Sequence, residues 1–453
     1  MAHCHRRSRS GWLALVLLAT APWLASAADP EQAGRLDAEL TPFGAQRAGN
    51  ADGSIPAWQG GLTQAPACYG GLGARYCNPF AEDRPETLVT ADRADAFEAW
   101  LSPGQRALLA QFPASQVMPV YATRRSYTNP APVLQAIRRN AMRAQLQANG
   151  EVLADAEQGV PFPIPENGAE VIWNHKARYR PAGLRVQDHQ FVVAPTGDFS
   201  QTVSRIDTLQ PYAQAGQPGV PMLRYTLQVF TEPPRLDGTV LLIHDSRDAL
   251  AQPRRAWQRS SGQPFLRKAP ALAHDAIVPG SDGILTIDQI DGFSGPLERY
   301  DFRLLGRQEL LVPANSYRLH SSALGYADLL GKHHLNPEHL RYERRRVWVV
   351  EAVLRAGVAH RYKRRRFYVD EDGWQIRVVD VYDARGTLIQ MQELHSVMAY
   401  DLGYEFVVAH AVYDLEHQRY LVQSLNNQAN EISLEALRAE DFEYGKVARR
   451  LDK

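Results

Sequence analysis

Several features that commonly indicate a protein's function are missing from this 453-residue sequence. Its 50 basic and 50 acidic side chains cancel, so net charge favours neither nucleic acid nor an acidic partner. There is no Gly-x-Ser-x-Gly nucleophile elbow, phosphate-binding glycine loop or dinucleotide fingerprint. After residue 27, no apolar run is long enough to span a bilayer. These absences disfavour hydrolases, nucleotide-dependent enzymes and integral membrane proteins.

Residues 1–27 form a predicted signal peptide. Basic side chains near the start precede an apolar run at residues 12–21, and Ala25-Ser26-Ala27 fits the small-x-small cleavage rule. The apolar run is too short and too rich in alanine for a membrane span. We therefore expect cleavage after Ala27 and a periplasmic protein, secreted across the inner membrane, that can associate with the outer membrane.

Cysteine is scarce, and the mature chain keeps only Cys68 and Cys77, on either side of a glycine-rich loop. An even count, close spacing and an oxidising compartment favour a disulfide between them. Two free thiols are the alternative. A zinc site is disfavoured because no other cysteine or histidine lies near enough to complete it. We expect the bridge to act as a local staple.

Glycine and proline separate the remaining chain into parts with different patterns. Capping signals predict helices in the first part. One begins with Ser102 as N-cap, Pro103 at the first position and Gln105 completing a capping box, and another is expected at residues 132–148. Ser433 is expected to cap a terminal helix at residues 433–439. The predicted division is a signal peptide at 1–27, an irregular helix-bearing arm with the cysteine loop at 28–158, a half-barrel domain at 159–425, and a C-terminal helix and tail at 426–453.

Residues 341–395 carry the clearest structural signal in the chain. Four β-branched and aromatic segments with period-2 patterning are separated by turns rich in aspartate and glycine. This pattern predicts a four-stranded antiparallel meander. Together with many further strand-like segments after residue 169, it predicts a mainly β protein with accessory helices, built on a large antiparallel sheet.

The second strand of this meander alternates basic and aromatic side chains, which places Arg364 and Arg366 on one face. Three roles fit these arginines. They could pair across strands with Glu351, Asp380 and Glu393 on a solvated face, or hold an anionic head group at the mouth of a cavity. Nucleic-acid binding is the third, and the compartment and the zero net charge disfavour it.

One cluster has side chains suitable for a metal: His333, His334, Glu338 and His339. The same stretch also fits the start of a helix, with Asn336 as N-cap and a proline after it. No calcium-loop spacing surrounds the acidic turn that follows the second meander strand. We therefore expect no metal and no cofactor.

Five stretches in order resemble a proteobacterial secreted family, domain of unknown function 1329, which is grouped with the outer-membrane lipoprotein-sorting (Lol-type) carriers. Together they extend over most of the mature chain. The matching stretches are AGNADGSIPAWQGGL at 48–62, GVPFPIPENGAEVIWNH at 159–175, RRAWQ at 254–258, HHLNPEHLRYERRRVWVVEA at 333–352 and RYKRRRFYVDEDGWQ at 361–375.

The resemblance implies a curved antiparallel half-barrel with helices over its concave side and an apolar cavity between them. It also implies partners: an inner-membrane exporter of the resistance-nodulation-division type and an outer-membrane protein. Lol-type carriers are smaller than this chain, so the arm and an insertion at residues 320–342 are expected to cover the cavity. The resemblance supplies no catalytic residues.

The expected function is that of a periplasmic carrier or binding protein for a hydrophobic, lipid-like molecule, without enzyme activity. Trp257 and Trp348 are candidates to line the cavity, and Arg364 and Arg366 to contact a head group. Two alternatives stay open: an adaptor that bridges an exporter and an outer-membrane protein without binding cargo, and an enzyme acting on a hydrophobic substrate in the cavity.

Overall fold

The computed structural model describes Met1 and residues 30–214, 220–429 and 433–451. The predicted signal peptide therefore lies almost wholly outside the described residues. Strands make up most of the regular structure. They are β1 (Thr87–Val89), β2 (Met118–Tyr121), β3 (Gln145–Gln147), β4 (Val152–Ala154), β5 (Gly183–Val193), β6 (Phe199–Leu209), β7 (Met222–Glu232), β8 (Val240–Ser246), β9 (Arg255–Arg259), β10 (Arg267–Lys268), β11 (Tyr300–Pro313), β12 (Tyr342–Leu354), β13 (Arg364–Asp370), β14 (Ile376–Tyr382), β15 (Leu388–Ala399), β16 (Tyr404–Asp414), β17 (Arg419–Leu425) and β18 (Ser433–Leu434).

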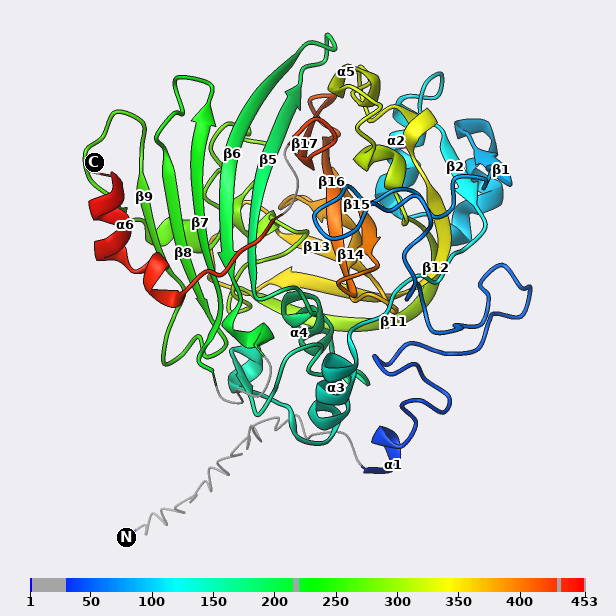
Figure 1. Cartoon of the computed structure of the whole chain (residues 1–453), viewed down its shortest axis with the longest axis horizontal. Helices are drawn as coiled ribbons and strands as arrows, with labels where there is room; N and C mark the ends of the chain where they lie inside the picture. Colours follow the sequence, from blue (N-terminus) through cyan, green and yellow to red (C-terminus); the bar gives the residue numbers. More distant parts are fainter. Residues whose placement is uncertain (2–29, 215–219, 430–432, 452–453) are drawn as a thin grey trace.

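Sixteen of the strands in the described residues join one sheet. Its order is β1-β2-β12-β13-β14-β15-β16-β17-β5-β6-β7-β8-β9-β10, with β11 paired to β12 and β18 to β5. Its pairs are antiparallel except that of β2 with β12, which is parallel. Figure 1 shows the sheet curving from β9, through β5 and β16, to β11 and β12. The predicted fold class, mainly β with a large curved antiparallel sheet and accessory helices, is confirmed.

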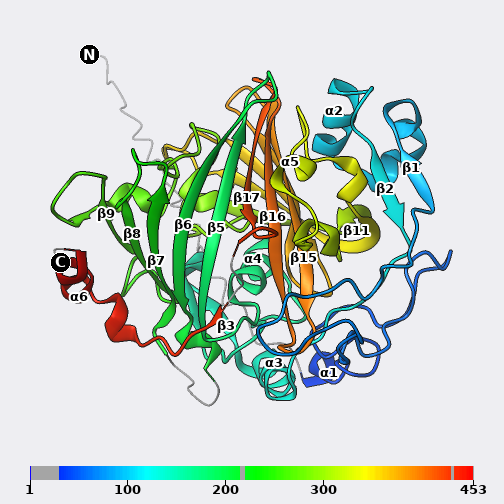
Figure 2. The same cartoon turned by 45° about the horizontal axis from the view of Figure 1, so that its top comes forward.

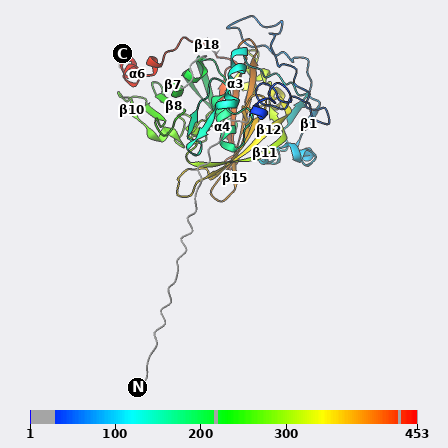
Figure 3. The same cartoon turned by 90° about the horizontal axis from the view of Figure 1, so that it is seen from below.

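The helices are short and lie on both sides of the sheet. Figure 3 shows α3 and α4 near one another against it. The α-helices are α1 (Pro30–Ala33), α2 (Pro103–Gln111), α3 (Ala131–Arg143), α4 (Gly168–Ala177), α5 (Tyr326–Leu329) and α6 (Tyr444–Leu451), and the 3₁₀ helices are η1 (Ala91–Trp100), η2 (Ala148–Gly150), η3 (Pro211–Ala213), η4 (Pro270–Ala273), η5 (Ile287–Gln289), η6 (Tyr317–His320), η7 (Pro337–His339) and η8 (Ala439–Phe442). Among the described residues, no helix combines the length and apolarity needed to cross a membrane.

The predicted meander forms as β12 to β15. Its register places Glu351 opposite Arg366 and Val379 opposite Gln392. The capping box of α2 is also present, with Ser102 Oγ accepting from the Gln105 backbone N–H at 3.1 Å and Gln105 Oε1 accepting from the Ser102 N–H at 3.0 Å. Both features depend on local sequence, which explains why they were predictable.

The central strands are packed on both faces. Val378 and Met391 belong to a core that also contains Leu108 of α2, whereas Val379 and Leu394 belong to a second core with α3, α4 and the arm. All four of these strand side chains are fully buried. The expected cavity between the sheet and its helices is therefore filled with side chains at these strands, and the clefts described below lie at the arm.

The ends of two predicted helices differ from expectation. The arm also supplies β1 and β2 to the main sheet. Helix α3 ends at Arg143 rather than residue 148, because residues 145–147 pair with β4. The terminal helix predicted at 433–439 is wrong: β18 lies there, and α6 follows, burying Val447 against β7 to β9.

Candidate functional site

The arm cleft is a depression of about 540 Å³ between the arm, at residues 78–88 and 117–121, and two segments near the insertion at 320–342: residues 315–318 just before it and residues 337–341 within it. More of its wall is apolar than polar. Leu88 of β1 leaves 47% of its surface exposed, although it is a large apolar side chain. The apolar lining residues are Phe80, Ala81, Pro85, Leu88, Val117, Pro119, Tyr121, Pro337 and Leu340.

Charged side chains lie at the floor and walls of the arm cleft. Asp83 is held by two guanidinium groups, with Oδ1 2.6 Å from Arg124 Nη2 and Oδ2 2.8 Å from Arg341 Nη2. Hydrogen bonds from Arg124, and then from Arg341, hold the pKa of Asp83 below its usual value. Arg341 also lies 4.7 Å from the ring centre of Tyr121. This carboxylate is therefore ionised and neutralised within the protein.

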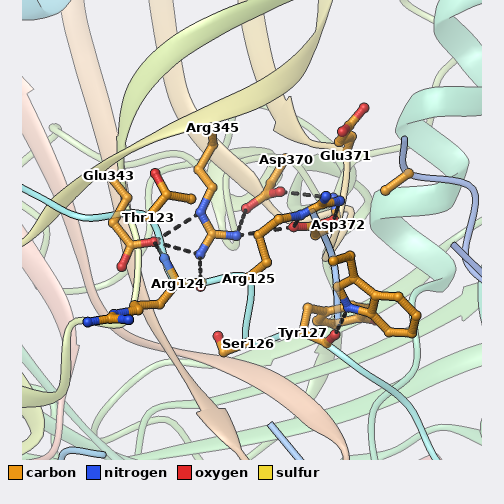
Figure 4. Close-up of polar contacts among 12 residues, drawn as sticks. Thr123, Arg124, Arg125, Ser126, Tyr127, Glu343, Arg345, Asp370, Glu371 and Asp372 are labelled. Carbon is orange, nitrogen blue, oxygen red and sulfur yellow. Dashed lines mark hydrogen bonds and ion pairs between the residues drawn. The ribbon is translucent and has the colours of Figure 1, made fainter. Parts of the chain in front are cut away.

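A buried cluster behind the cleft joins the arm to the sheet, and Figure 4 shows it. Arg345 Nη2 lies 2.7 Å from Glu343 Oε2, and its Nη1 lies 3.3 Å from Asp372 Oδ2. From the arm, Arg125 Nη2 contacts Asp372 Oδ1 at 2.6 Å. Arg125 also donates to the backbone carbonyl of Gln46 at 2.9 Å. We call Arg125, Glu343, Arg345 and Asp372 the arm anchor.

The arm anchor is a cluster of charged side chains that are shielded from solvent. All four of its members are buried. Burial alone would raise the pKa of Glu343, but Arg345 and Arg341 hold that pKa below its usual value. Because each carboxylate faces guanidinium groups, the anchor is suited to holding the arm in place, and to no acid–base step. Arg341 connects it to the arm cleft, since Arg341 Nε donates to Glu343 Oε1 at 2.7 Å.

A second depression, the tyrosine cleft, has a volume of about 390 Å³. It lies between the cysteine loop and the start of β16, where the arm passes along the sheet (Figure 2). Its lining is largely aromatic and aliphatic. The lining residues are Leu72, Gly73, Ala74, Arg75, Tyr76, His320, Leu402, Tyr404, Phe406, Ser433 and Leu434.

A disulfide between Cys68 and Cys77 closes the loop that forms one wall of the tyrosine cleft. Tyr69 and Tyr76 stack within this loop, with ring centres 5.4 Å apart. Both hydroxyl groups donate to the carboxylate of Asp401, at 2.6 and 2.7 Å. The loop is thus fastened to the sheet by two hydrogen bonds as well as closed by the bridge.

Comparison with known proteins identifies the family. The family described as "Protein of unknown function (DUF1329)" matches residues 88–447. The chain belongs to the DUF1329 family. Uncharacterized protein PA3922 of Pseudomonas aeruginosa is 39% identical over 439 residues, which are 96% of this chain and 94% of that protein. The predicted resemblance is therefore confirmed.

Solved structures with similar folds share little sequence with this DUF1329 protein. A Vibrio parahaemolyticus domain assigned to outer-membrane lipoprotein sorting is 14% identical, covering 62% of this chain and 98% of its own, with a TM-score of 0.43. A DUF1329 family protein from Desulfovibrio piger is 16% identical, covering 58% and 91%, with a TM-score of 0.41. LolA superfamily protein NE2245 from Nitrosomonas europaea is 12% identical, covering 62% and 98%, with a TM-score of 0.37.

The two tryptophans proposed for the cavity wall lie outside the lining of both clefts. Trp257, on β9, is buried against His244 and Tyr444, with ring centres 4.8 and 5.9 Å away. Trp348, on β12, stacks on Trp374 at 6.2 Å and is covered by the guanidinium of Arg307 at 4.9 Å. Their role as ligand contacts stays a prediction without support from these positions.

Arg364 and Arg366 both pair with Glu351, at 3.1 and 3.0 Å. Cross-strand pairing, the first of the three roles considered, therefore describes this part of β13. It does not extend to Asp380 and Glu393, which are buried beneath α2 rather than solvated. Asp380 accepts from Ser102 Oγ and Glu393 from Gln105 Nε2, both at 3.0 Å. Sequence alternation could not reveal that a helix covers this face.

The histidines of the insertion contact different partners. His333 stacks on Phe112 at 4.5 Å, His334 Nε2 lies 2.9 Å from Ser115 Oγ, and His339 Nδ1 lies 3.2 Å from Arg318 Nη2. Within the ranges covered by the structure, no group of three or more potential ligands is arranged to hold a metal. Of these residues only His339 lines the arm cleft, together with Arg318. Sequence reasoning missed Arg318 and Arg84, which carry no motif.

Proposed function

We propose that this DUF1329 protein is a periplasmic carrier or binding protein for a hydrophobic, lipid-like molecule. The supporting observation is the arm cleft, whose volume of about 540 Å³ lies within the range typical of small-molecule sites. Its mainly apolar walls come from the arm and the insertion, the two segments expected to cover a cavity. A ligand lying there would shield Leu88 from water.

Binding in the arm cleft needs no covalent chemistry. Removing apolar surface from water contributes about 25 cal/mol per Å², so an acyl chain that buries roughly 200 Å² gains about 5 kcal/mol. We propose that the arm moves when ligand enters or leaves the cleft. Because the arm anchor holds the arm at Arg125, that movement would take place in the rest of the arm. We therefore propose a binding role without an enzymatic step.

Native mass spectrometry tests the proposal. The mature protein is purified from its own periplasm, weighed intact, and then extracted with solvent for lipid identification. A stoichiometric, extractable amphiphile is the expected result and would give the class of the cargo. A mass equal to the bare chain, together with failure to take up a dansyl-labelled fatty alcohol, would refute the carrier role.

A matched pair of variants locates the site. Leu88→Asp places a charge on the wall of the arm cleft, whereas Leu250→Asp alters a side chain that is 66% exposed in the loop between β8 and β9. Loss of apolar contact with the chain should weaken binding of the dansyl-labelled fatty alcohol roughly tenfold in Leu88→Asp. Leu250→Asp should bind like the unaltered protein. If both variants bind the dansyl-labelled fatty alcohol with equal affinity, the probe binds outside the arm cleft.

The proposal includes an inner-membrane exporter of the resistance-nodulation-division type and an outer-membrane protein as partners. This part is supported by family membership alone. Purification of the tagged protein from detergent-solubilised envelopes should recover both partners at a constant ratio. Recovery of neither, under conditions in which the protein retains its amphiphile, would limit the proposal to a binding protein that acts without fixed partners.

An adaptor without cargo is the second candidate, and one observation favours it. The central strands are packed on both faces, and apolar Leu72 and Leu434 lie exposed beside the tyrosine cleft, at 76% and 45%. An apolar patch of this kind suits a protein partner. Partner recovery combined with an empty intact mass would favour the adaptor over the carrier.

A further inference from the structure

Two guanidinium groups in the arm cleft lack a carboxylate partner among the described residues. They are Arg84 on the arm and Arg318 on η6, and both line the cleft and are exposed. We infer that the arm cleft selects an amphiphile with an anionic head, a carboxylate or a phosphate, which Arg84 and Arg318 bind while the apolar walls take the chain. This inference rests on the proposed function.

The neighbouring arginines differ from Arg84 and Arg318, because their guanidinium groups form ion pairs with carboxylates. Arg341 is bound to Asp83 and Glu343, at 2.8 and 2.7 Å, and Arg124 is bound to Asp83. Their charges are thus neutralised by the protein. Within the part of the chain that the structure describes, Arg84 by contrast donates only to backbone carbonyls, those of Ala81 and Asp83, both at 3.1 Å. Carbonyl groups satisfy hydrogen bonds but leave the positive charge uncompensated.

Arg318 is in a similar state on the opposite wall. The one hydrogen bond of its guanidinium among the described residues runs from Nη2 to Nδ1 of His339, at 3.2 Å. Burial, and then the charge of Arg318, lower the pKa of His339, so the imidazole is neutral and accepts this bond. The histidine orients the guanidinium without cancelling its charge. A planar fork with free donors suits a carboxylate or phosphate oxygen pair.

One acidic side chain in the cleft lining would repel a bound anion. Glu338 on η7 lines the cleft, as Arg318 does, and is exposed. The other lining carboxylate, Asp83, is already held by two arginines. Removing the charge of Glu338 should therefore strengthen binding of an anion and leave binding of a neutral chain unchanged. This opposite effect separates a charge-selective cleft from a purely apolar one.

The test uses three dansyl-labelled probes with the same chain: a fatty acid, an alkyl phosphate and a fatty alcohol. The fatty acid or the phosphate should bind the unaltered protein roughly tenfold or more tightly than the alcohol, with the advantage shrinking as salt rises. The double variant Arg84→Gln/Arg318→Gln should bind all three probes with the affinity of the alcohol. The anion with the larger loss identifies the head group.

Two controls make the outcome decisive. Arg385→Gln removes an exposed arginine in the turn between β14 and β15, outside the cleft lining, and should change nothing. If the double variant does not fold, as judged by circular dichroism, Glu338→Gln replaces it and should bind the anions roughly two- to fivefold more tightly and the alcohol equally. Equal affinity of all probes for the unaltered protein overturns the head-group inference but leaves the carrier role. Binding of none overturns both.

Discussion

Glu393 is a buried carboxylate that has no lysine or arginine partner among the residues that the structure describes. It lies on β15 beneath α2, where Oε1 accepts from Gln105 Nε2 at 3.0 Å and Oε2 accepts from the Tyr342 hydroxyl at 2.8 Å. His395 Nε2 lies 3.8 Å from Glu393 Oε2, and burial lowers the pKa of His395 to about 3. Burial raises the pKa of Glu393 to about 7.

Glu393→Gln should therefore stabilise the protein at high pH. The folded state binds the proton more tightly than the unfolded state, where the pKa is about 4.5, so this side chain's contribution to stability is largest below that pH and is lost as pH rises through about 7. The variant should gain about 2 kcal/mol in the free energy of unfolding at about pH 8, and nothing at about pH 4. Urea denaturation across this range measures it. An equal gain at both pH values would contradict the assignment.

Asp372, unlike Glu393, is a buried carboxylate that forms ion pairs with two arginines, Arg125 and Arg345. Asp372→Asn should leave the buried guanidinium of Arg125 without its carboxylate partner, while Arg345 keeps Glu343, and should cost about 3 kcal/mol in the free energy of unfolding. Asp301→Asn is the control, since Asp301 is 59% exposed and its pair with Arg355 lies at the surface. That variant should change stability by less than about 1 kcal/mol. Similar losses in both would show that the arm anchor contributes nothing special.

Helix α2 is held close to the sheet by its second residue. A Cβ on Gly104 would overlap Oδ1 of Asp380 and the side chain of Met391. The backbone N–H of Gly104 donates to that same oxygen at 3.0 Å. The close approach therefore needs glycine for reasons of space.

Gly104→Ala should lower the free energy of unfolding by about 2 kcal/mol, because the helix must move away from β14 and β15. Gly445 is a matched control, as it is also the second residue of a helix, α6, and its Cβ would meet only Arg449 Nη1 at 3.8 Å. Gly445→Ala should be neutral or slightly stabilising. Thermal denaturation followed by circular dichroism compares them, and equal effects would exclude the steric explanation.

The cysteine loop is a second element that depends on one local constraint. Cys68→Ser/Cys77→Ser should cost about 2 kcal/mol, since the open loop gains conformational entropy when unfolded. Tyr69 and Tyr76 should also lose their fixed position on Asp401. Cleavage of the loop by a protease of low specificity should become faster in the double variant. Unchanged cleavage would show that the tyrosine hydrogen bonds hold the loop by themselves.

A ligand that binds only the folded protein raises the free energy of unfolding of the whole molecule. A ligand at about a hundred times its dissociation constant stabilises the folded state by about 2.7 kcal/mol, which for a chain of this size corresponds to about 3 °C in melting temperature. The dansyl-labelled fatty acid should produce this shift in the unaltered protein and in Leu250→Asp. At the same ligand concentration it should produce about half of this shift, about 1.5 °C, in Leu88→Asp, because the affinity of that variant is expected to be tenfold lower. Equal shifts in melting temperature in all three proteins would show that the ligand binds outside the arm cleft.

Local sequence was sufficient for several features. The meander of β12 to β15 follows from strand-prone segments and their Asp/Gly turns, and the start of α2 from Ser102, Pro103 and Gln105. The pairing of Cys68 with Cys77 was predicted from their even count, their close spacing and the expected oxidising compartment. Each of these depends on residues within about ten positions of one another, so the chain's own pattern contains the information.

The clefts and the partners of the arginines were decided by tertiary structure. The parallel pairing of β2 with β12 brings residues 78–88 beside η6, which places Arg84 and Arg318 in one cleft although 234 positions (318 − 84) separate them. Similarly, α2 covers Asp380 and Glu393, which the first of the three roles considered for the arginines placed on a solvated face. Charge and hydrophobicity are readable along the chain. Which charges meet, and which stay without a partner, depends on contacts between distant segments, and only packing sets these.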